Sequence, residues 1–422
     1  MILPDIVPEP VGDGTRLSEL TTMRVGGPAE RILLARSAED LAGFATELHD
    51  AGEPWLLLGG GSNTVVSDEG FPGPVLLVRS TGISVVEDAE AAAAGRVRVR
   101  AQAGHDWDHL VASCVARGWA GIEALSGIPG LAGAAPVQNI GAYGQELAEV
   151  LHSVEFLDLA AGEVRRLSAA ELELGYRDSA IKRGLEGVVL SIDLLLEDAG
   201  AALAGAGADV DAGDPAAPGR HAAPGSGPEA GTDAGPALSA PVRYAQLASA
   251  LGVELGTRVP LRVLRDAVLR LRAAKGMVLD EEDHDSWSAG SFFTNPIVSE
   301  RFARSLPADA PRFPIGETES APAVTSFEEL AAGVPLRVPQ PAAERSVKLS
   351  AAWLIEHSGL SRGFRLPGSG AAISSKHTLA ITNGGAATAG EVAELARLVV
   401  QRVQQEFGLI LAPEPNLYGL EL

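Results

Sequence analysis

Hydrophobic positions recur along the chain with two spacings, which predict alternating strands and helices. Residues 31–35 and 55–58 are short apolar runs typical of buried strands, and the pattern between them predicts a helix over 38–51. Ser37 stands at the N-cap position of that helix. The order strand, helix, strand and then the glycine-rich loop 59–63 resembles a βαβ unit, which places a ligand loop at the carboxyl end of a strand.

The rest of the chain continues this alternation and predicts an α+β protein. In the helix expected over 261–275, apolar residues three or four positions apart form one stripe. A strand with a turn is expected at 18–29, and ordered structure resumes at 242–251. Strands are also expected at 64–66, 75–78, 96–100, 153–159, 187–195, 371–374 and 379–383, and helices at 107–117, 347–356 and 391–407.

Two stretches lack the composition of a packed core. Residues 198–240 are almost entirely Ala, Gly, Pro and Asp, with no aromatic side chain, and predict a disordered insertion. Residues 306–345 are rich in Pro and Ala and predict a second, partly ordered insertion. Both insertions would separate segments that carry stronger structural signals.

Glycines are concentrated in two places: 59–63, which follows an apolar segment, and 121–144, where they are interleaved with apolar residues. Such loops let backbone N–H groups approach a ligand without side chains in the way, which suits a phosphate or a flat polar ring. Each cluster alone is weak evidence, because glycine runs are common in surface loops. Together they favour a clamp around an extended diphosphate ligand.

Composition excludes several classes of function. A formal net charge of −22 argues against a nucleic-acid partner, which would require a basic surface. The single cysteine, Cys114, excludes an intramolecular disulfide framework and a cysteine-rich metal site, and we expect no metal. Without a signal-peptide pattern or an apolar run of about 20 residues, we expect no membrane insertion and a cytoplasmic location.

Three side chains could carry acid–base or electrostatic chemistry, and each also has an ordinary structural explanation. Arg177 could stabilise an oxyanion or carboxylate, or form a structural ion pair. Ser291, between a glycine and two phenylalanines, could donate a proton, or could simply be small. Glu414 lies between two prolines and could be a surface carboxylate. The same alternatives apply to the polar residues Tyr244, Lys275, Asn295 and His377.

Taken together, seven motifs place the chain near a known family. They occur in the order Thr21–Pro28, Leu58–Asn63, Ser126–Gly130, Pro136–Gly144, Tyr176–Ser179, Ala289–Pro296 and Pro413–Glu414. In this order they resemble the UDP-N-acetylenolpyruvoylglucosamine reductase (MurB) family. The resemblance covers nearly the whole chain outside the two insertions.

The resemblance implies a flavoprotein of three parts. A small α/β part, 1–80 with the tail 409–422, and a larger α+β part, 81–276, would bind FAD between them. An α+β part, 277–408, would bind the substrate. The implied FAD-binding residues are Gly59, Gly60, Gly61, Ser62, Asn63, Gly127, Ile128, Pro129, Gly130, Gly133, Gln138, Asn139, Ile140, Gly141 and Ala142.

The resemblance also implies a reaction. NADPH would reduce the flavin, and flavin N5 would then deliver hydride to the methylene carbon of the enolpyruvyl group of a UDP-sugar, giving UDP-N-acetylmuramate for peptidoglycan synthesis. By motif match, Ser291 would donate the proton, and Arg177 and Glu414 would stabilise the enolate-like intermediate. The implied substrate-binding residues are Tyr244, Lys275, Asn295 and His377. The family commonly has a glutamine at the position of His377. We expect a monomer.

Two other functions remain possible at this point. An FAD-dependent oxidase of small alcohols commonly shows a His or Cys near the first glycine loop for covalent flavin attachment, and 59–63 contains neither. A paralogue that binds FAD without catalysis would be expected to have lost part of the trio Arg177, Ser291 and Glu414. All three residues are present, which favours the reductase.

Overall fold

The computed structural model describes residues 14–200, 236–315 and 345–422. The chain forms two compact units that exchange segments along the sequence. Unit 1 contains Ala29–Gly60 and Pro72–Val278, and unit 2 contains Gly14–Pro28, Gly61–Phe71 and Leu279–Leu422. The chain passes from unit 1 to unit 2 inside the first glycine loop, between Gly60 and Gly61.

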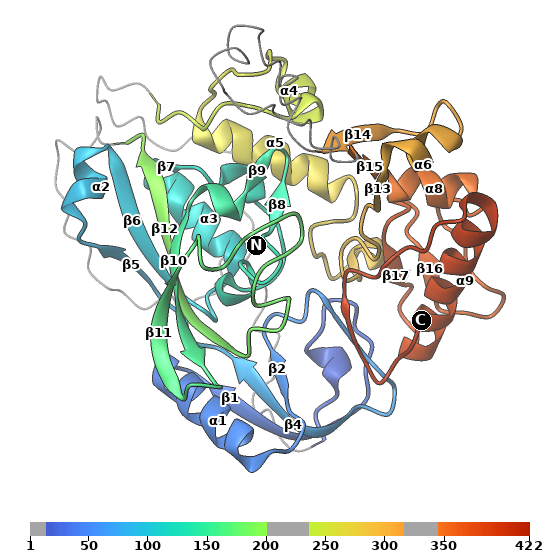
Figure 1. The fold of residues 1–422 in the computed structure, drawn as a ribbon, viewed down its shortest axis with the longest axis horizontal. Helices are drawn as coiled ribbons and strands as arrows, with labels where there is room; N and C mark the ends of the chain where they lie inside the picture. Colours follow the sequence, from blue (N-terminus) through green and yellow to red (C-terminus); the bar gives the residue numbers. More distant parts are fainter. Residues whose placement is uncertain (1–13, 201–235, 316–344) are drawn as a thin grey trace, which may run out of the picture. The chain divides into compact units, whose positions relative to one another are not determined.

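Unit 1 begins with a small three-stranded sheet covered by one helix (Figure 1). Its strands β1 (Ala29–Ala35), β4 (Phe71–Val78) and β2 (Leu56–Leu58) lie in that order, and β2 and β4 are parallel. Helix α1 (Ala38–Ala51) has the expected capping box, in which Ser37 and Asp40 bond each other's backbone amides. The predicted strand–helix–strand unit is therefore confirmed.

A six-stranded sheet forms the larger part of unit 1. Its main path is β11–β10–β12–β6–β5, and β7 also pairs with β12. The long strand β12 is central between β10 and β6, and most of its residues are buried. The strands are β5 (Ile83–Val86), β6 (Arg96–Gln102), β7 (Trp119–Ala120), β10 (Leu151–Asp158), β11 (Glu163–Ser168) and β12 (Gly187–Asp198).

The described residues of unit 1 also form four further α-helices and one short hairpin (Figure 1). Helices α3 and α5 contribute Leu110, Cys114 and Leu261 to the main core, together with the sheet. The hairpin belongs to the second glycine stretch. The elements are α2 (Ala89–Ala93), α3 (Trp107–Ala116), α4 (Ala245–Leu251), α5 (Leu261–Ala273), β8 (Gly141–Ala142) and β9 (Gln145–Glu146).

Unit 2 consists of short strands and helices. Strand β3 (Thr64–Val66) pairs in parallel with β18 (Asn416–Tyr418), so the chain's tail lies beside the segment that follows the first glycine loop. The other elements are β13 (Ile297–Ser299), α6 (Glu300–Ser305), β14 (Arg312–Ile315), β15 (Ser346–Leu349), α8 (Ala351–His357), β16 (Ala371–Ile373), β17 (Ile381–Asn383) and α9 (Ala389–Phe407).

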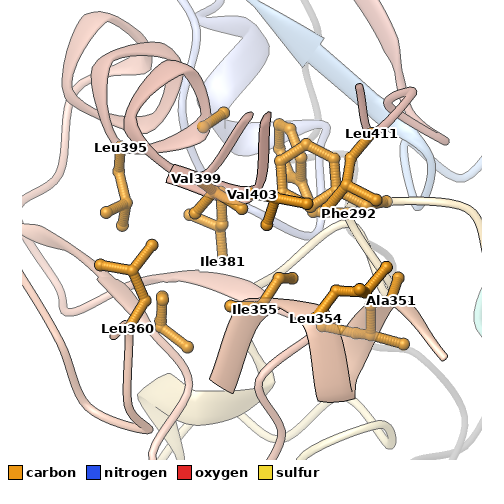
Figure 2. Packing of buried hydrophobic residues seen from close by; sticks show 14 of the residues in the cluster. Phe292, Ala351, Leu354, Ile355, Leu360, Ile381, Leu395, Val399, Val403 and Leu411 are labelled. Atoms are coloured by element: carbon orange, nitrogen blue, oxygen red, sulfur yellow. The ribbon is translucent and has the colours of Figure 1, made fainter. Parts of the chain in front are cut away.

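The core of unit 2 forms between α9, α8 and the loop that contains Ser291 (Figure 2). Helix α9 presents Leu395, Val399 and Val403 to this core, and Phe292 packs in the same cluster. The helix begins at the capping box of Thr388 and ends at Gly408, which adopts φ 70°. The predicted apolar face of this helix is confirmed, and it fixes one side of the Ser291 loop.

Two predicted elements are wrong. Residues 18–29 do not form a strand, because Arg24 (φ 54°) and Gly26 (φ 129°) interrupt the extended backbone, and β1 begins only at Ala29. The helix predicted over 347–356 is instead strand β15 followed by α8. Ser346–Leu349 pairs with both β13 and β14, and Ser350 caps the helix that follows.

The edges of the first predicted insertion are also corrected, and the second is partly ordered as predicted. Residues 198–200 and 236–240 are structured: Asp198 ends β12, and Ser239 donates its backbone N–H to the carbonyl oxygen of Val259. Residues 306–315 include β14. The remainders of the predicted insertions, 201–235 and 316–344, lie outside the described residues.

The predicted α+β class is confirmed by this mixture of antiparallel and parallel sheets with packed helices. Among the helices that the structure describes, none combines the length and apolarity of a membrane span. Within the same residues, no three His, Cys, Asp or Glu side chains gather as metal ligands would.

Candidate functional site

The second glycine stretch crosses the connection between β6 and α3 in unit 1. Backbone bonds hold it there: Trp107 donates its N–H to the carbonyl oxygen of Gly130 (3.0 Å), and Gly133 donates to that of Ala103 (2.8 Å). A Cβ at Gly133 would lie 2.6 Å from the Cβ of Ala103, so no larger residue fits there. The stretch is therefore a fixed loop whose shape depends on glycine.

The two glycine clusters meet within unit 1. A Cβ at Gly60 would lie 3.0 Å from the Cα of Gly130, and one at Gly59 would lie 3.5 Å from the side chain of Leu131. The guanidinium of Arg79 stabilises the first loop by donating to the carbonyl oxygen of Gly59 (3.1 Å). The arrangement offers two adjacent stretches of backbone with little side chain between them, as a cradle for a flat or diphosphate ligand requires.

Asn139 and Arg177 fix the far end of the second loop. Asn139 has φ 43° and is buried, and its side chain donates to the carbonyl oxygen of Gly175 (3.0 Å) and accepts from the N–H of Ala148 (2.9 Å). The guanidinium of Arg177 donates to the carbonyl oxygens of Asn139 (3.5 Å) and Gly141 (3.3 Å). The side chain of Asn139 thus shapes the loop, and the cation of Arg177 lies at its edge.

Two tyrosines and a lysine lie next to this loop. Tyr143, with φ 48°, packs edge-on against Tyr244 with ring centroids 5.6 Å apart. Lys275 places its ammonium 5.5 Å from the centroid of Tyr143 and donates to Gln246 (2.9 Å). Of the predicted substrate-binding residues, unit 1 therefore brings Tyr244 and Lys275 together around Tyr143.

Positive charge accumulates around Tyr143. Arg272, near the end of α5, interacts electrostatically with Arg177, Lys275 and Tyr143, and we call Arg177, Arg272 and Lys275 the basic cluster. Burial lowers the pKa of Arg272 to about 10, and the charge of Arg177 adds to this effect. Burial and then the charge of Arg272 lower the pKa of Lys275. Burial raises the pKa of Tyr143, so its hydroxyl stays protonated at neutral pH.

In unit 2, the end of the first glycine loop is tied to the chain's tail. The carbonyl oxygen of Gly61 accepts from the N–H of Thr22 (3.2 Å), and the hydroxyl of Thr22 donates to the carbonyl oxygen of Ser288 (2.7 Å). Asn63 donates its side-chain N–H to the carbonyl oxygen of Glu414 (3.2 Å). The predicted FAD residues 61–63 and the segment around Glu414 are therefore neighbours.

Ser291 and Glu414 lie on adjacent stretches of backbone. The N–H of Glu414 donates to the carbonyl oxygen of Phe292 (2.9 Å), and Phe293 forms a β-bridge with Pro413. Phe292 and Phe293 are both buried and pack edge to face, with centroids 5.2 Å apart. These two rings anchor the loop, which explains why a serine is followed by two phenylalanines.

Asn295 and His377 border the same loop. Asn295 accepts the N–H of Ala351 (2.9 Å) at the start of α8, so part of its role is structural. His377 lies in the turn between β16 and β17, and the carbonyl oxygen of Leu379 in that turn accepts the N–H of Phe292 (2.7 Å). Unit 2 thus assembles Ser291, Glu414, Asn295 and His377 around one loop.

The remaining predicted FAD residues lie within the same two loops. Ile128, Ile140 and Ala142 pack partly against the main core of unit 1, and Gln138 and Pro129 are their neighbours in sequence. Arg177 belongs to unit 1, and Ser291 and Glu414 belong to unit 2. Sequence reasoning did not single out Arg272. Its position three residues before Lys275 was a possible signal, because residues three apart share a helical face.

Comparisons with known proteins agree along the chain. Residues 29–168 match the FAD binding domain family, and residues 282–418 match the family "UDP-N-acetylenolpyruvoylglucosamine reductase, C-terminal domain". The chain is 56% identical over 412 residues to the UDP-N-acetylenolpyruvoylglucosamine reductase of Leifsonia xyli, covering 97% of this chain and 100% of that protein. It is 44% identical to the reductase of Saccharopolyspora erythraea over 97% of this chain and 96% of that protein.

A solved structure shows the same fold. The chain superposes on the MurB reductase of Thermus caldophilus with a TM-score of 0.53 and 24% identity, covering 96% of this chain and 97% of that one. At this identity the match bears on the fold alone.

Proposed function

Because this chain belongs to the UDP-N-acetylenolpyruvoylglucosamine reductase family, we propose that it reduces the enolpyruvyl ether of UDP-N-acetylglucosamine to UDP-N-acetylmuramate, with NADPH as reductant. The similarity that supports this extends over the whole length of a relative with that name. We propose that the reaction belongs to the cytoplasmic steps of peptidoglycan precursor synthesis and that the enzyme acts as a monomer.

FAD is the cofactor, and the glycine loops of unit 1 fit it. The close approach of Gly60 to Gly130 sets two stretches of backbone side by side with little side chain, as binding of an isoalloxazine ring or a diphosphate requires. The residues proposed to hold FAD are those of the loops 59–63 and 127–142 that were named from the sequence. The bound flavin supplies hydride chemistry that no amino-acid side chain can provide.

Ser291 is the proposed proton donor. The observation that carries this role is the bond from the N–H of Glu414 to the carbonyl oxygen of Phe292, which sets Ser291 next to a carboxylate residue within unit 2. A serine hydroxyl is a weak acid, so it protonates carbon only when it is held in contact with a strongly basic carbanion away from water. The buried rings of Phe292 and Phe293 hold the backbone of Ser291 in place.

Arg177 is the proposed partner of the substrate carboxylate. Its φ of 53° and its bonds to two loop carbonyls fix the guanidinium at the edge of the glycine loop. A fixed cation there stabilises negative charge that develops between the ether oxygen and the carboxylate, without reorganising during the reaction. Glu414 is proposed to stabilise the same intermediate.

The UDP part of the substrate requires cations and polar groups. Lys275 is the proposed partner of the diphosphate. Tyr244, which is 44% exposed, is a second proposed contact of the substrate. Asn295 and His377 are the proposed contacts in unit 2. We also propose that the two parts 1–80 and 81–276 act as the FAD-binding domain and that 277–408 acts as the substrate-binding domain.

A two-stage anaerobic experiment tests the function and the role of Ser291 separately. NADPH should bleach the yellow protein, and enolpyruvyl-UDP-N-acetylglucosamine should restore the colour. In Ser291→Ala the first stage should keep its rate, and the second should slow by about 10²–10⁴-fold, because only the proton transfer is lost. Ser361→Ala, at an exposed serine of the same unit, is the matched control.

Two results would contradict these proposals. Failure of the wild-type protein to regain its colour would exclude the proposed substrate. A wild-type rate of reoxidation in Ser291→Ala would exclude Ser291 as the proton donor while leaving the function intact.

A further inference from the structure

Arg272 has no carboxylate within salt-bridge distance among the described residues of unit 1. One terminal nitrogen donates to the carbonyl oxygen of Met277 (3.0 Å), whereas Nε is buried and has no hydrogen-bond partner among the described residues. Burying a polar N–H without a partner costs about 1–3 kcal/mol, more when the group is charged. A feature that costs this much indicates a ligand.

The surroundings of Arg272 show where that ligand lies. Its Nε is 3.5 Å from the position that a Cβ would occupy on Gly127, in the second glycine loop. Asp108 acts electrostatically on Arg272, but Arg265 (2.6 and 2.7 Å) and the N–H of Gly127 (2.6 Å) already occupy that carboxylate. The basic cluster therefore has an excess of positive charge next to the glycine loop.

We infer that Arg272 is a further cofactor-binding residue, whose guanidinium contacts the electronegative pyrimidine edge of the flavin ring. This inference rests on FAD occupying the glycine loops, and it is independent of the proposed substrate and proton donor. Positive charge at that edge stabilises the electron-rich reduced ring more than the oxidised one, and so raises the reduction potential.

The packing of the basic cluster favours the cofactor over the substrate. Arg272 also interacts electrostatically with Tyr143, but its Nε lies beside Gly127, in the loop that meets Gly60. The ammonium of Lys275 lies by Tyr143, on the proposed substrate side. A favourable interaction with the C-terminal end of helix α5 does not explain why the side chain of Arg272 is buried. Arg270 occupies the same last turn of α5 and satisfies its favourable interaction with the helix dipole while exposed to solvent.

The test is the two-electron midpoint potential of the bound flavin, measured by equilibration with reference dyes in the absence of substrate. Arg272→Met should make the potential more negative. We expect the ratio of affinities for reduced and oxidised FAD to fall ten- to a hundredfold, which corresponds to about 30–60 mV. Arg272→Lys should retain most of the wild-type potential, and Arg270→Met, the matched control on the same helical turn, should leave it unchanged.

Several outcomes would overturn the inference. One is an unchanged potential in Arg272→Met with FAD bound, and a raised KM for the UDP-sugar in that variant would then assign Arg272 to the substrate. If Arg272→Met cannot retain FAD, Arg272→Lys decides. Retention of FAD near the wild-type potential supports a role of charge, and loss of FAD from both variants shows that Arg272 acts through packing.

Discussion

Gly61 shows how one residue can determine a functional loop. It adopts φ 60°, and a Cβ there would collide with the carbonyl oxygen of Leu20 and lie 2.7 Å from the Cα of Thr21. Both obstacles are backbone atoms, so they cannot rotate away. Gly61 is therefore required twice, for its left-handed conformation and for its lack of a side chain.

Gly61→Ala should destabilise the protein by about 3 kcal/mol or more, because backbone strain of ~1–2 kcal/mol adds to overpacking. Gly162→Ala is the matched control: Gly162 has φ 69° but open space around it, so only the strain of about 1 kcal/mol should appear. Urea unfolding measures both. Equal effects in the two variants would show that the loop moves away from Leu20 without cost.

For single residues, the sequence shows which positions belong to the glycine loops and motifs more readily than it shows what each side chain contacts. The glycine clusters and the motif residues could be found because glycine content and order are visible in the chain. Arg272 was missed, because its spacing from Lys275 is a weak signal and its importance depends on burial and on its charged neighbours, which tertiary packing sets. Asn139 is predicted to contact FAD, and its side chain also bonds to Gly175 and Ala148, a structural role that only the folded chain reveals.

Among the elements, helix α9 shows how a distant side chain can complete a helix cap. The carboxylate of Asp68 accepts the N–H groups of Ala389 and Gly390 (both 2.9 Å), and Thr388 accepts that of Glu391 (3.2 Å). Three amides of the first turn are thereby bonded, and a negative charge lies at the positive end of the helix. Asp68 follows the glycine loop by a few residues, so the cap also anchors that loop in unit 2.

Asp68→Ala should lower the free energy of unfolding by about 1–2 kcal/mol, through loss of the cap and of the favourable interaction with the helix dipole. Its neighbour Glu69 is exposed, and Glu69→Ala should change stability by less than about 0.5 kcal/mol. Chemical denaturation compares the two variants. A drop of the same size in both would indicate a general effect of net charge rather than capping.

The elements that the sequence predicted are those with their own local signals. Helices α1 and α9 have capping boxes and apolar faces, and β12 is a long apolar run. Strands β13, β14 and β15 are short and depend on one another for pairing, so no local pattern distinguished β15 from a helix. Strand β18 was missed for the same reason, since its partner β3 is far away in the sequence.

For the molecule as a whole, the described residues on either side of 201–235 lie at one place on unit 1. A Cβ at Gly118 would lie 2.9 Å from the Cα of Gly200 and 3.3 Å from the Cβ of Ala237, so both ends of the described chain contact Gly118. A short connection can therefore replace the segment without moving β12 or α5. Its composition predicts that it adds no core.

Replacing 201–235 by a four-residue Gly-Ser linker should stabilise unit 1 by about 2 kcal/mol, because a shorter loop costs less entropy to close. FAD should remain bound. The control is a Gly-Ser linker of the original length, which should leave stability unchanged. Loss of FAD or of stability in both variants would show that the natural segment packs on the protein.

The buried position of Cys114 has a practical consequence. It is the chain's single cysteine, it lies within the core of unit 1, and burial raises the pKa of its thiol to about 12. At neutral pH only about one thiol in 10⁵ is then ionised, so an alkylating reagent can modify it only when unit 1 opens. The rate at which Cys114 is alkylated in the native protein therefore reports how often unit 1 opens. A ligand that binds only the closed form must lower that rate in proportion to its occupancy.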